Sequence, residues 1–161
     1  NPNGIHGMAK DSGYPIICLA REPVAAIYSY YRLKRDRFKE TVEDLSLWIE
    51  ERFREYAEFY KTALAVGQNN PTNFLILRYE DVCSSAEYLQ KICDFIGEPP
   101  KLDPRFVHHV TRFANFIKGG DRTFYREGDN AKWRNDSDFV TNLSRNDYPS
   151  LPELGYPKLT I

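Results

Sequence analysis

The sequence predicts an α/β fold in which a short parallel sheet is flanked by helices. Two short apolar runs rich in β-branched residues carry this prediction, at 15–20 (PIICLA) and at 73–79 (NFLILRY). Almost uninterrupted apolar runs of this length are typical of strands that are buried on both faces of a parallel sheet. A segment with helical spacing of its apolar residues follows each run, so we expect helices beside the sheet.

Composition limits the function classes. The chain has 161 residues, which fits one domain over 1–161 with a sizeable core. A formal net charge of −1 gives no overall attraction to nucleic acid or to an anionic membrane, so an anion site would have to be local. No apolar run approaches the roughly 20 residues that span a bilayer. The three cysteines, Cys18, Cys83 and Cys93, lack metal-ligand spacing, and we interpret them as reduced thiols.

The first predicted strand ends at a charge. Arg21 follows its last apolar residue and is expected at the carboxyl end of the strand, where open α/β sheets bind their ligands. Pro23 favours the start of a helix, because proline is tolerated in the first helical turn. Ser29 follows Arg21 by eight residues and lies about two turns along this helix, so both side chains could reach one anion. The buried face of this helix is predicted to consist of Val24, Ile27, Tyr28 and Tyr31.

The next segments are predicted to form a long helix. The basic run 32–39 is interpreted as a solvated helix end. Thr41 opens a motif similar to a capping box, and residues 67–71 are expected to end the long helix that follows. The apolar face of this helix would comprise Leu45, Trp48, Ile49, Phe53, Tyr56, Ala57, Tyr60, Ala63 and Leu64.

The second predicted strand is followed by further helices. A capping box at 84–87 predicts a helix that Gly97 ends, and another helix is expected after Pro104. His108 and His109 are adjacent and cannot share one metal ion, so we interpret both as structural or exposed. Residues 124–135 are interpreted as a loop that carries a tryptophan. The proline-rich tail at 149–157 is expected to be extended.

Two of these segments resemble motifs of the sulfotransferases that use 3′-phosphoadenosine 5′-phosphosulfate (PAPS). The run 21–31 (REPVAAIYSYY) is similar to the motif whose Arg and Ser hold the 3′-phosphate, which implies this role for Arg21 and Ser29. The run 79–81 (YED), followed by a helix that ends in Phe-Ile-Gly, resembles the family's second long stretch. This resemblance implies that Tyr79 lies beside the nucleotide.

Three weaker matches extend the resemblance. His6 stands where many family members have a Thr-His-Gly segment, which implies that it is the general base. Thr111 and Phe113 match a segment that packs against the adenine. Arg126, Gly128 and Trp133 match the C-terminal nucleotide loop, which clasps the 3′-phosphate. Glu127 stands where the family usually has Lys, so the contact from that position is expected to be lost.

Together the matches imply a P-loop-like, three-layer α/β fold. The family begins with a strand and a loop that binds the 5′-phosphosulfate, and neither precedes Asn1, so we expect the domain to be incomplete at its N-terminus. The implied reaction is sulfuryl transfer from PAPS to a hydroxyl or amine, without a metal, leaving adenosine 3′,5′-bisphosphate. His6 would remove the acceptor's proton, while Arg21, Ser29 and Arg126 would hold the 3′-phosphate.

Two alternatives stay open from the sequence. One is a nucleotide-binding or structural module without catalysis. The other is a different P-loop transferase, such as a small-molecule kinase, for which Asp81 would be the candidate Mg²⁺ ligand. The expected partner is a small-molecule or carbohydrate acceptor, with no nucleic acid and no membrane segment in this chain. We expect a cytoplasmic protein, or one of the Golgi lumen if an anchor precedes this sequence; the sequence does not indicate an oligomeric state.

Overall fold

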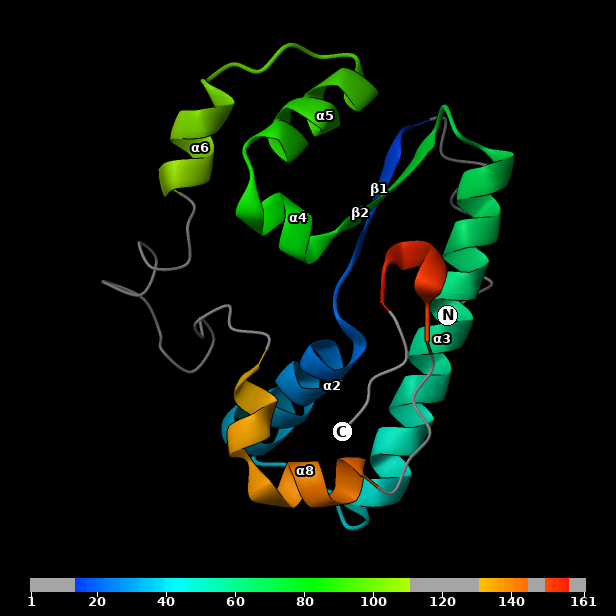
Figure 1. Cartoon of the computed structure of the whole chain (residues 1–161), viewed down its shortest axis with the longest axis vertical. Helices are drawn as coiled ribbons and strands as arrows, with labels where there is room; N and C mark the ends of the chain where they lie inside the picture. Colours follow the sequence, from blue (N-terminus) through cyan, green and yellow to red (C-terminus); the bar gives the residue numbers. More distant parts are fainter. Residues whose placement is uncertain (1–13, 111–130, 145–149, 157–161) are drawn as a thin grey trace. The chain divides into compact units, whose positions relative to one another are not determined.

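The computed structural model describes residues 14–110, 131–144 and 150–156. It divides into two compact units, which are described separately below. The first unit comprises Asn1–Arg21 and Glu58–Arg112, and the second comprises Glu22–Ala57 and Phe113–Ile161. Figure 1 shows the helices and strands in sequence colours.

The first unit contains the predicted parallel sheet. Strand β1 (Ile16–Ala20) pairs with β2 (Phe74–Arg78) in parallel, with Ile16 opposite Phe74 and Ala20 opposite Arg78. The two strands run side by side in Figure 1. Both predicted strands and their parallel direction are therefore confirmed.

The expectation that β1 is buried on both faces is wrong. Ala20 is fully buried, but Leu19 is 48% exposed and residues 16–18 are half-buried. The cause is the width of the sheet, because β2 is the one strand that pairs with β1 within the described residues. A sheet of two strands leaves apolar side chains at the surface that further strands or helices would cover.

The long helix α3 (Leu45–Asn69) contributes its C-terminal half to the first unit. The hydroxyl of Tyr60 donates a 2.7 Å hydrogen bond to the carbonyl of Leu19 and ties the helix to β1. Gly67 faces β2, where an added Cβ would lie 3.3 Å from the ring of Phe74. Gly67 thus allows α3 to pack closely against β2. The helix continues past Gly67 and ends at Asn69, within the predicted range 67–71.

Three short helices follow β2. They are α4 (Tyr79–Ser84), α5 (Glu87–Ile96) and α6 (Pro104–Val110). The predicted capping box is wrong, because the chain first forms α4 and it is the hydroxyl of Ser85 that accepts from the backbone of Glu87 (3.2 Å). The predicted stop at Gly97 is confirmed by its φ of 79°, a left-handed conformation that glycine adopts without strain.

The second unit is built around α2 (Pro23–Arg32). The carboxylate of Glu22 caps this helix by accepting from the backbone N–H groups of Val24 (3.1 Å) and Ala25 (2.6 Å). The predicted buried face is confirmed, since Val24, Ile27, Tyr28 and Tyr31 are all buried. A π-helical segment, η1 (Leu33–Phe38), continues α2.

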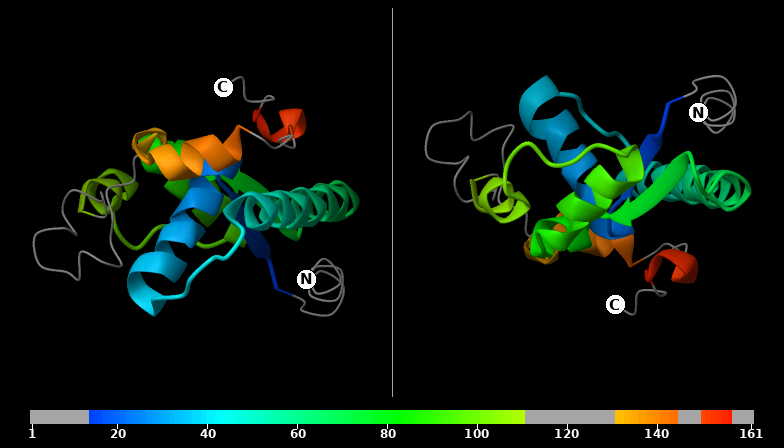
Figure 2. Two further views of the ribbon diagram at one scale, coloured as in Figure 1. Left: turned by 90° about the horizontal axis from the view of Figure 1, so that it is seen from below. Right: turned by 90° about the horizontal axis from the view of Figure 1, so that it is seen from above.

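The C-terminal segments complete this unit. They are the 3₁₀-helix η2 (Lys132–Asn135), α8 (Ser137–Leu143) and the 3₁₀-turn η3 (Pro152–Leu154). Figure 2 shows α8 and α2 from two further directions. The core of the unit joins α2, the start of α3, η2 and α8 through buried side chains: Val24, Ile27, Tyr28, Tyr31, Ile49, Phe53, Trp133, Phe139 and Leu143.

Three local expectations for the second unit are corrected. The basic run is more than a solvated helix end, because Arg32 and Arg35 make specific contacts within the unit. Asp44, and not Thr41, caps α3, since its carboxylate accepts from the backbone of Leu47 (3.0 Å). The described part of the tail is not extended, because a bridge between Leu151 and Tyr156 closes it around η3. Among the described helices, none has the length and apolar character that crossing a membrane would require.

Candidate nucleotide site

The carboxyl ends of β1 and β2 bring together two of the predicted site residues. Ala20, the last residue of β1, lies opposite Arg78, the last residue of β2, in the parallel register. The residues that follow the two strands, Arg21 and Tyr79, therefore meet at the same edge of the sheet. The guanidinium carbon of Arg21 lies 5.1 Å from the centre of the Tyr79 ring, within the range of a cation–π contact. Both residues are half-buried. The sheet edge thus presents a cation held against an aromatic face.

The surroundings of Tyr79 keep its hydroxyl protonated. Burial raises the pKa of this phenol, and a hydrogen bond with Cys83 raises it further, whereas the charge of Arg21 acts in the opposite direction. The net result is a pKa above the ordinary value of about 10. At neutral pH the hydroxyl can therefore donate to an anion as well as accept a hydrogen bond.

Asp81, the residue that a kinase would need as a Mg²⁺ ligand, lies in the first turn of α4. Its carboxylate is 4.0 Å from the guanidinium of Arg78, so it already has a cationic neighbour. Within the described ranges, no group of three or more His, Cys, Asp or Glu side chains is arranged to hold a metal ion.

Ser29 lies in the second unit, on the exposed side of α2. Its neighbours Tyr28 and Tyr31 point into the core and fix the rotation of the helix about its axis. Ser29 is thus exposed to solvent, as a ligand-binding residue requires. Arg21 belongs to the first unit, so the predicted sharing of one anion by Arg21 and Ser29 stays a prediction.

Trp133 has a structural explanation that the sequence alone did not provide. Its side chain is 5% exposed and belongs to the aromatic core of the second unit. The guanidinium of Arg134 lies 5.1 Å from the centre of its ring. Packing accounts for a tryptophan in this segment, and a direct contact of Trp133 with a nucleotide stays a prediction.

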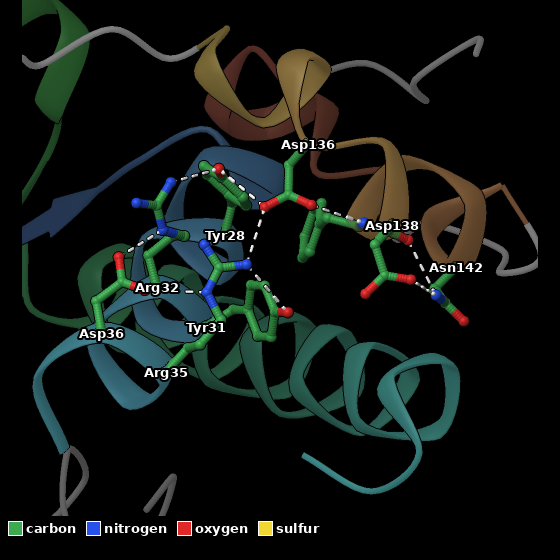
Figure 3. Close-up of polar contacts among 9 residues, drawn as sticks. Tyr28, Tyr31, Arg32, Arg35, Asp36, Asp136, Asp138 and Asn142 are labelled. Carbon is green, nitrogen blue, oxygen red and sulfur yellow. Dashed lines mark hydrogen bonds and ion pairs between the residues drawn. The ribbon is translucent and has the colours of Figure 1, made fainter. Parts of the chain in front are cut away.

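A polar network connects α2 and η1 with Asp136, which lies about a hundred residues later in the sequence. The sequence analysis did not predict this network. Asp136, the N-cap of α8, accepts from the hydroxyl of Tyr28 and from Arg35, each at 3.3 Å (Figure 3). Asp36 in turn accepts from Arg32 (2.7 Å) and Arg35 (2.9 Å). An Asp directly before a short helix and basic residues at helical spacing after Tyr28 are sequence signals for its members, but neither signal predicts that they pair.

The network shifts the ionisation of its members. Partial burial alone would raise the pKa of Asp36, but hydrogen bonds from Arg35 and Arg32 bring it below its ordinary value. Burial alone would lower the pKa of Arg35, but hydrogen bonds to Asp36 and Tyr31 raise it. The charged forms of both residues are therefore favoured in the fold.

A polar cleft of about 450 Å³ lies beside this network. Its lining carries two cations, one carboxylate and uncharged polar groups, contributed by Tyr28, Arg32, Lys132, Asn135, Asp136 and Ser137. The cleft is open to solvent and lies between α2 and the segment that contains η2 and the start of α8. Polar and charged ligands suit such a lining better than apolar ones.

Five predicted site residues lie outside the described residues. They are the predicted base His6, the adenine contacts Thr111 and Phe113, and the loop residues Arg126 and Gly128. Their roles stay predictions.

Comparisons with known proteins agree with the resemblance of the motifs. No significant match is found among curated proteins or among solved structures. A family model described as "Sulfotransferase domain" matches residues 6–142, which is most of the chain and includes every predicted site residue. This family has a P-loop-like fold, in agreement with the mixed helices and parallel strands described above. The chain therefore belongs to the sulfotransferase domain family, whose general reaction is the transfer of a sulfuryl group to an acceptor.

Proposed function

We propose that the protein is a PAPS-dependent sulfotransferase that acts on a hydroxyl or amine of a small-molecule or carbohydrate acceptor. The observation that carries this proposal is the pairing of Arg21 with Tyr79 at the carboxyl ends of β1 and β2. Carboxyl ends of parallel strands are where α/β folds bind ligands, and this end carries a fixed positive charge. A nucleotide with a 3′-phosphate supplies both an anion for the guanidinium and a flat base for aromatic contacts.

Arginine suits this task for a geometric reason. Its guanidinium can donate two parallel hydrogen bonds to two oxygens of one phosphate, which a lysine cannot do. Contact with the ring of Tyr79 restricts the guanidinium before ligand arrives, so less side-chain entropy is lost on binding. The hydroxyl of Ser29, an exposed residue, is the proposed second donor, and Arg126 is the proposed third.

The proposed reaction is an in-line displacement at sulfur. The acceptor oxygen or nitrogen forms a bond to sulfur while the bond between sulfur and the 5′-phosphate oxygen breaks, and adenosine 3′,5′-bisphosphate leaves. His6 takes the acceptor's proton as the new bond forms, because an imidazole with a pKa near 6.5 is a competent base at neutral pH. The remaining residues act by positioning, which lowers the barrier by removing the entropy cost of bringing donor and acceptor together.

A binding experiment tests the nucleotide site. We expect calorimetric titration to show tighter binding of adenosine 3′,5′-bisphosphate than of 5′-AMP, because only the bisphosphate carries the 3′-phosphate. In Arg21→Ala the bisphosphate should bind at least about tenfold more weakly, since charge-assisted hydrogen bonds contribute about 1.5–3 kcal/mol. Arg54→Ala is the matched control, because Arg54 is an exposed arginine of α3 that pairs only loosely with Glu50 at 3.7 Å. Equal binding of the two nucleotides by the wild-type chain would refute the proposal.

A second experiment separates catalysis from binding. In a chain that includes the 5′-phosphosulfate loop expected upstream of Asn1, His6→Gln should lower kcat for sulfuryl transfer from PAPS to a phenol by about 10²–10⁴-fold, the usual contribution of a general base. Its affinity for adenosine 3′,5′-bisphosphate should stay unchanged, because the base contacts the acceptor and not the 3′-phosphate. A nucleotide-binding module without catalysis would instead bind the bisphosphate and show no transfer in the wild type.

A further inference from the structure

Tyr60 joins the long helix α3 to the strand that leads into Arg21. Its hydroxyl donates a 2.7 Å hydrogen bond to the backbone carbonyl of Leu19, two residues before Arg21. The side chain of Tyr60 is 9% exposed, so its ring is packed within the fold. Tyr60, Leu19, Arg21 and Tyr79 all belong to the first unit, and the structure therefore defines how they lie relative to one another.

The carbonyl of Leu19 points away from β2. The backbone N–H of Ile16 donates to the carbonyl of Asn73 (2.8 Å), so in the parallel register the peptide groups of Ile16, Cys18 and Ala20 face β2. Peptide groups of successive residues face opposite edges of a strand, which places those of Leu19 on the other edge. Within the described residues β2 is the one strand that pairs with β1, and at this other edge the donor comes from a side chain of α3.

This hydrogen bond reinforces a part of β1 that burial holds only weakly. The side chain of Leu19 is 48% exposed, whereas the next residue, Ala20, is fully buried and faces β2. The helix on which Tyr60 lies is well packed, because Ala63 and Val66, which follow Tyr60 at helical spacing, are at most 2% exposed. The hydroxyl of Tyr60 thus ties the end of β1 to a well-packed helix.

The position of Arg21 depends on the end of this strand. Arg21 lies at most about 8 Å along the backbone from Leu19, because consecutive Cα atoms are about 3.8 Å apart. Its guanidinium carbon lies 5.1 Å from the centre of the ring of Tyr79, which follows β2. A shift of the backbone at Leu19 is therefore carried directly to the pair at the strand ends.

We propose that Tyr60 is a positioning residue that holds the end of β1 so that Arg21 is aligned with the 3′-phosphate of the nucleotide. This inference rests on the proposed function. Tyr60 does not contact the nucleotide; it acts through the backbone carbonyl of Leu19. Groups that bind a ligand need positions fixed to within about 0.5 Å, so a small movement of the strand end is enough to misalign the guanidinium.

Three variants test this role. Tyr60→Phe removes the hydroxyl that binds the carbonyl of Leu19 and keeps the packed ring. The matched control is Thr62→Val, which removes a hydroxyl two residues along α3 whose hydrogen bond goes to the carbonyl of Glu58 (2.9 Å), in the same helix. The double variant Arg21→Ala/Tyr60→Phe tests whether the effect of Tyr60 passes through Arg21.

The readout is the pair of dissociation constants for adenosine 3′,5′-bisphosphate and 5′-AMP, measured by calorimetry with the melting temperature recorded in parallel. We expect Tyr60→Phe to weaken binding of the bisphosphate about three- to fivefold, less than the roughly 100-fold that a 1 Å misplacement can cost. Binding of 5′-AMP, which lacks the 3′-phosphate, should change less than about twofold, and Thr62→Val should match the wild type. In the Arg21→Ala background, Tyr60→Phe should weaken the bisphosphate less than about 1.5-fold, because effects that act through one residue are not additive.

The outcomes separate this inference from the proposed function. A wild-type chain that does not prefer the bisphosphate overturns the proposed function, and the inference with it. If the wild type shows this preference, unchanged binding by Tyr60→Phe overturns the inference alone, and so does an equal loss with and without Arg21. A parallel loss of both nucleotides, in step with a fall in melting temperature, also overturns it, because a purely structural role would produce that pattern.

Discussion

The two units of the chain differ in how they bury their apolar side chains. In the first unit, strand and helix faces remain partly open, with Leu19 48%, Ile96 44% and Phe106 56% exposed. In the second unit, Phe53, Phe139 and Leu143 are each at most 2% exposed, and aromatic rings surround them. The larger buried cluster lies in the second unit, although Phe38 (56%) and Leu47 (51%) of that unit are exposed as well. The first unit carries the strand-end pair Arg21 and Tyr79, and the second carries Ser29 and the polar cleft, so candidate ligand chemistry is present in both units.

The largest effect is expected from two substitutions that truncate an apolar side chain to alanine, one in each unit. Phe139→Ala removes a fully buried ring that packs against Tyr28 and Tyr31, so we expect the free energy of unfolding to fall by about 3–5 kcal/mol. Leu19→Ala in the first unit should cost well under half of that, because its side chain is about half exposed. Urea unfolding followed by circular dichroism measures both. Similar losses for the two variants would show that the difference in burial has no energetic consequence.

The cap of α2 offers a smaller test at the start of the second unit. Glu22→Ala removes the carboxylate that accepts from the backbone of Val24 and Ala25, and we expect a loss of about 1 kcal/mol in the free energy of unfolding. Glu22→Gln keeps one of the two acceptor oxygens and should lose less. A comparable cost for both variants would mean that the single oxygen kept by Gln does not cap the helix.

Sequence patterns predicted the parts of each unit that depend on local chemistry. The strands, the start of α2 at Pro23 and the stop at Gly97 follow from apolar runs, proline and glycine, and the structure confirms them. The sequence could not predict the Asp136 network, because its partners Tyr28 and Arg35 are about a hundred residues away in the chain. It also placed Trp133 by its motif, whereas the packing of its ring in the core depends on tertiary structure.

A still smaller effect is expected at the strand ends. Tyr79→Leu removes the aromatic face beside Arg21, and a cation–π contact at a partly exposed site contributes about 0.5–1 kcal/mol, so the affinity for adenosine 3′,5′-bisphosphate should fall about two- to fivefold. Tyr79→Phe keeps the ring and should retain most of this affinity. Calorimetric titration of both variants gives the comparison. If Tyr79→Phe loses as much as Tyr79→Leu, the hydroxyl and not the ring is what the ligand uses.

The smallest effect concerns the pH dependence of the second unit. Because its hydrogen bonds with Arg35 and Arg32 hold the pKa of Asp36 below the ordinary value of about 3.9, this carboxylate stabilises the fold at pH values above that value and loses its contribution as the pH falls through the lowered pKa. At pH 7 we therefore expect Asp36→Asn to melt at a lower temperature than the wild type, and the gap to narrow between pH 5 and pH 3. Partly exposed ion pairs contribute only about 0.2–1 kcal/mol, so the gap should be modest and should shrink in high salt. If the difference in melting temperature instead widened in acid, Asp36 would be held in its protonated form. The ion pairs of Asp36 with Arg32 and Arg35 would then not stabilise the second unit.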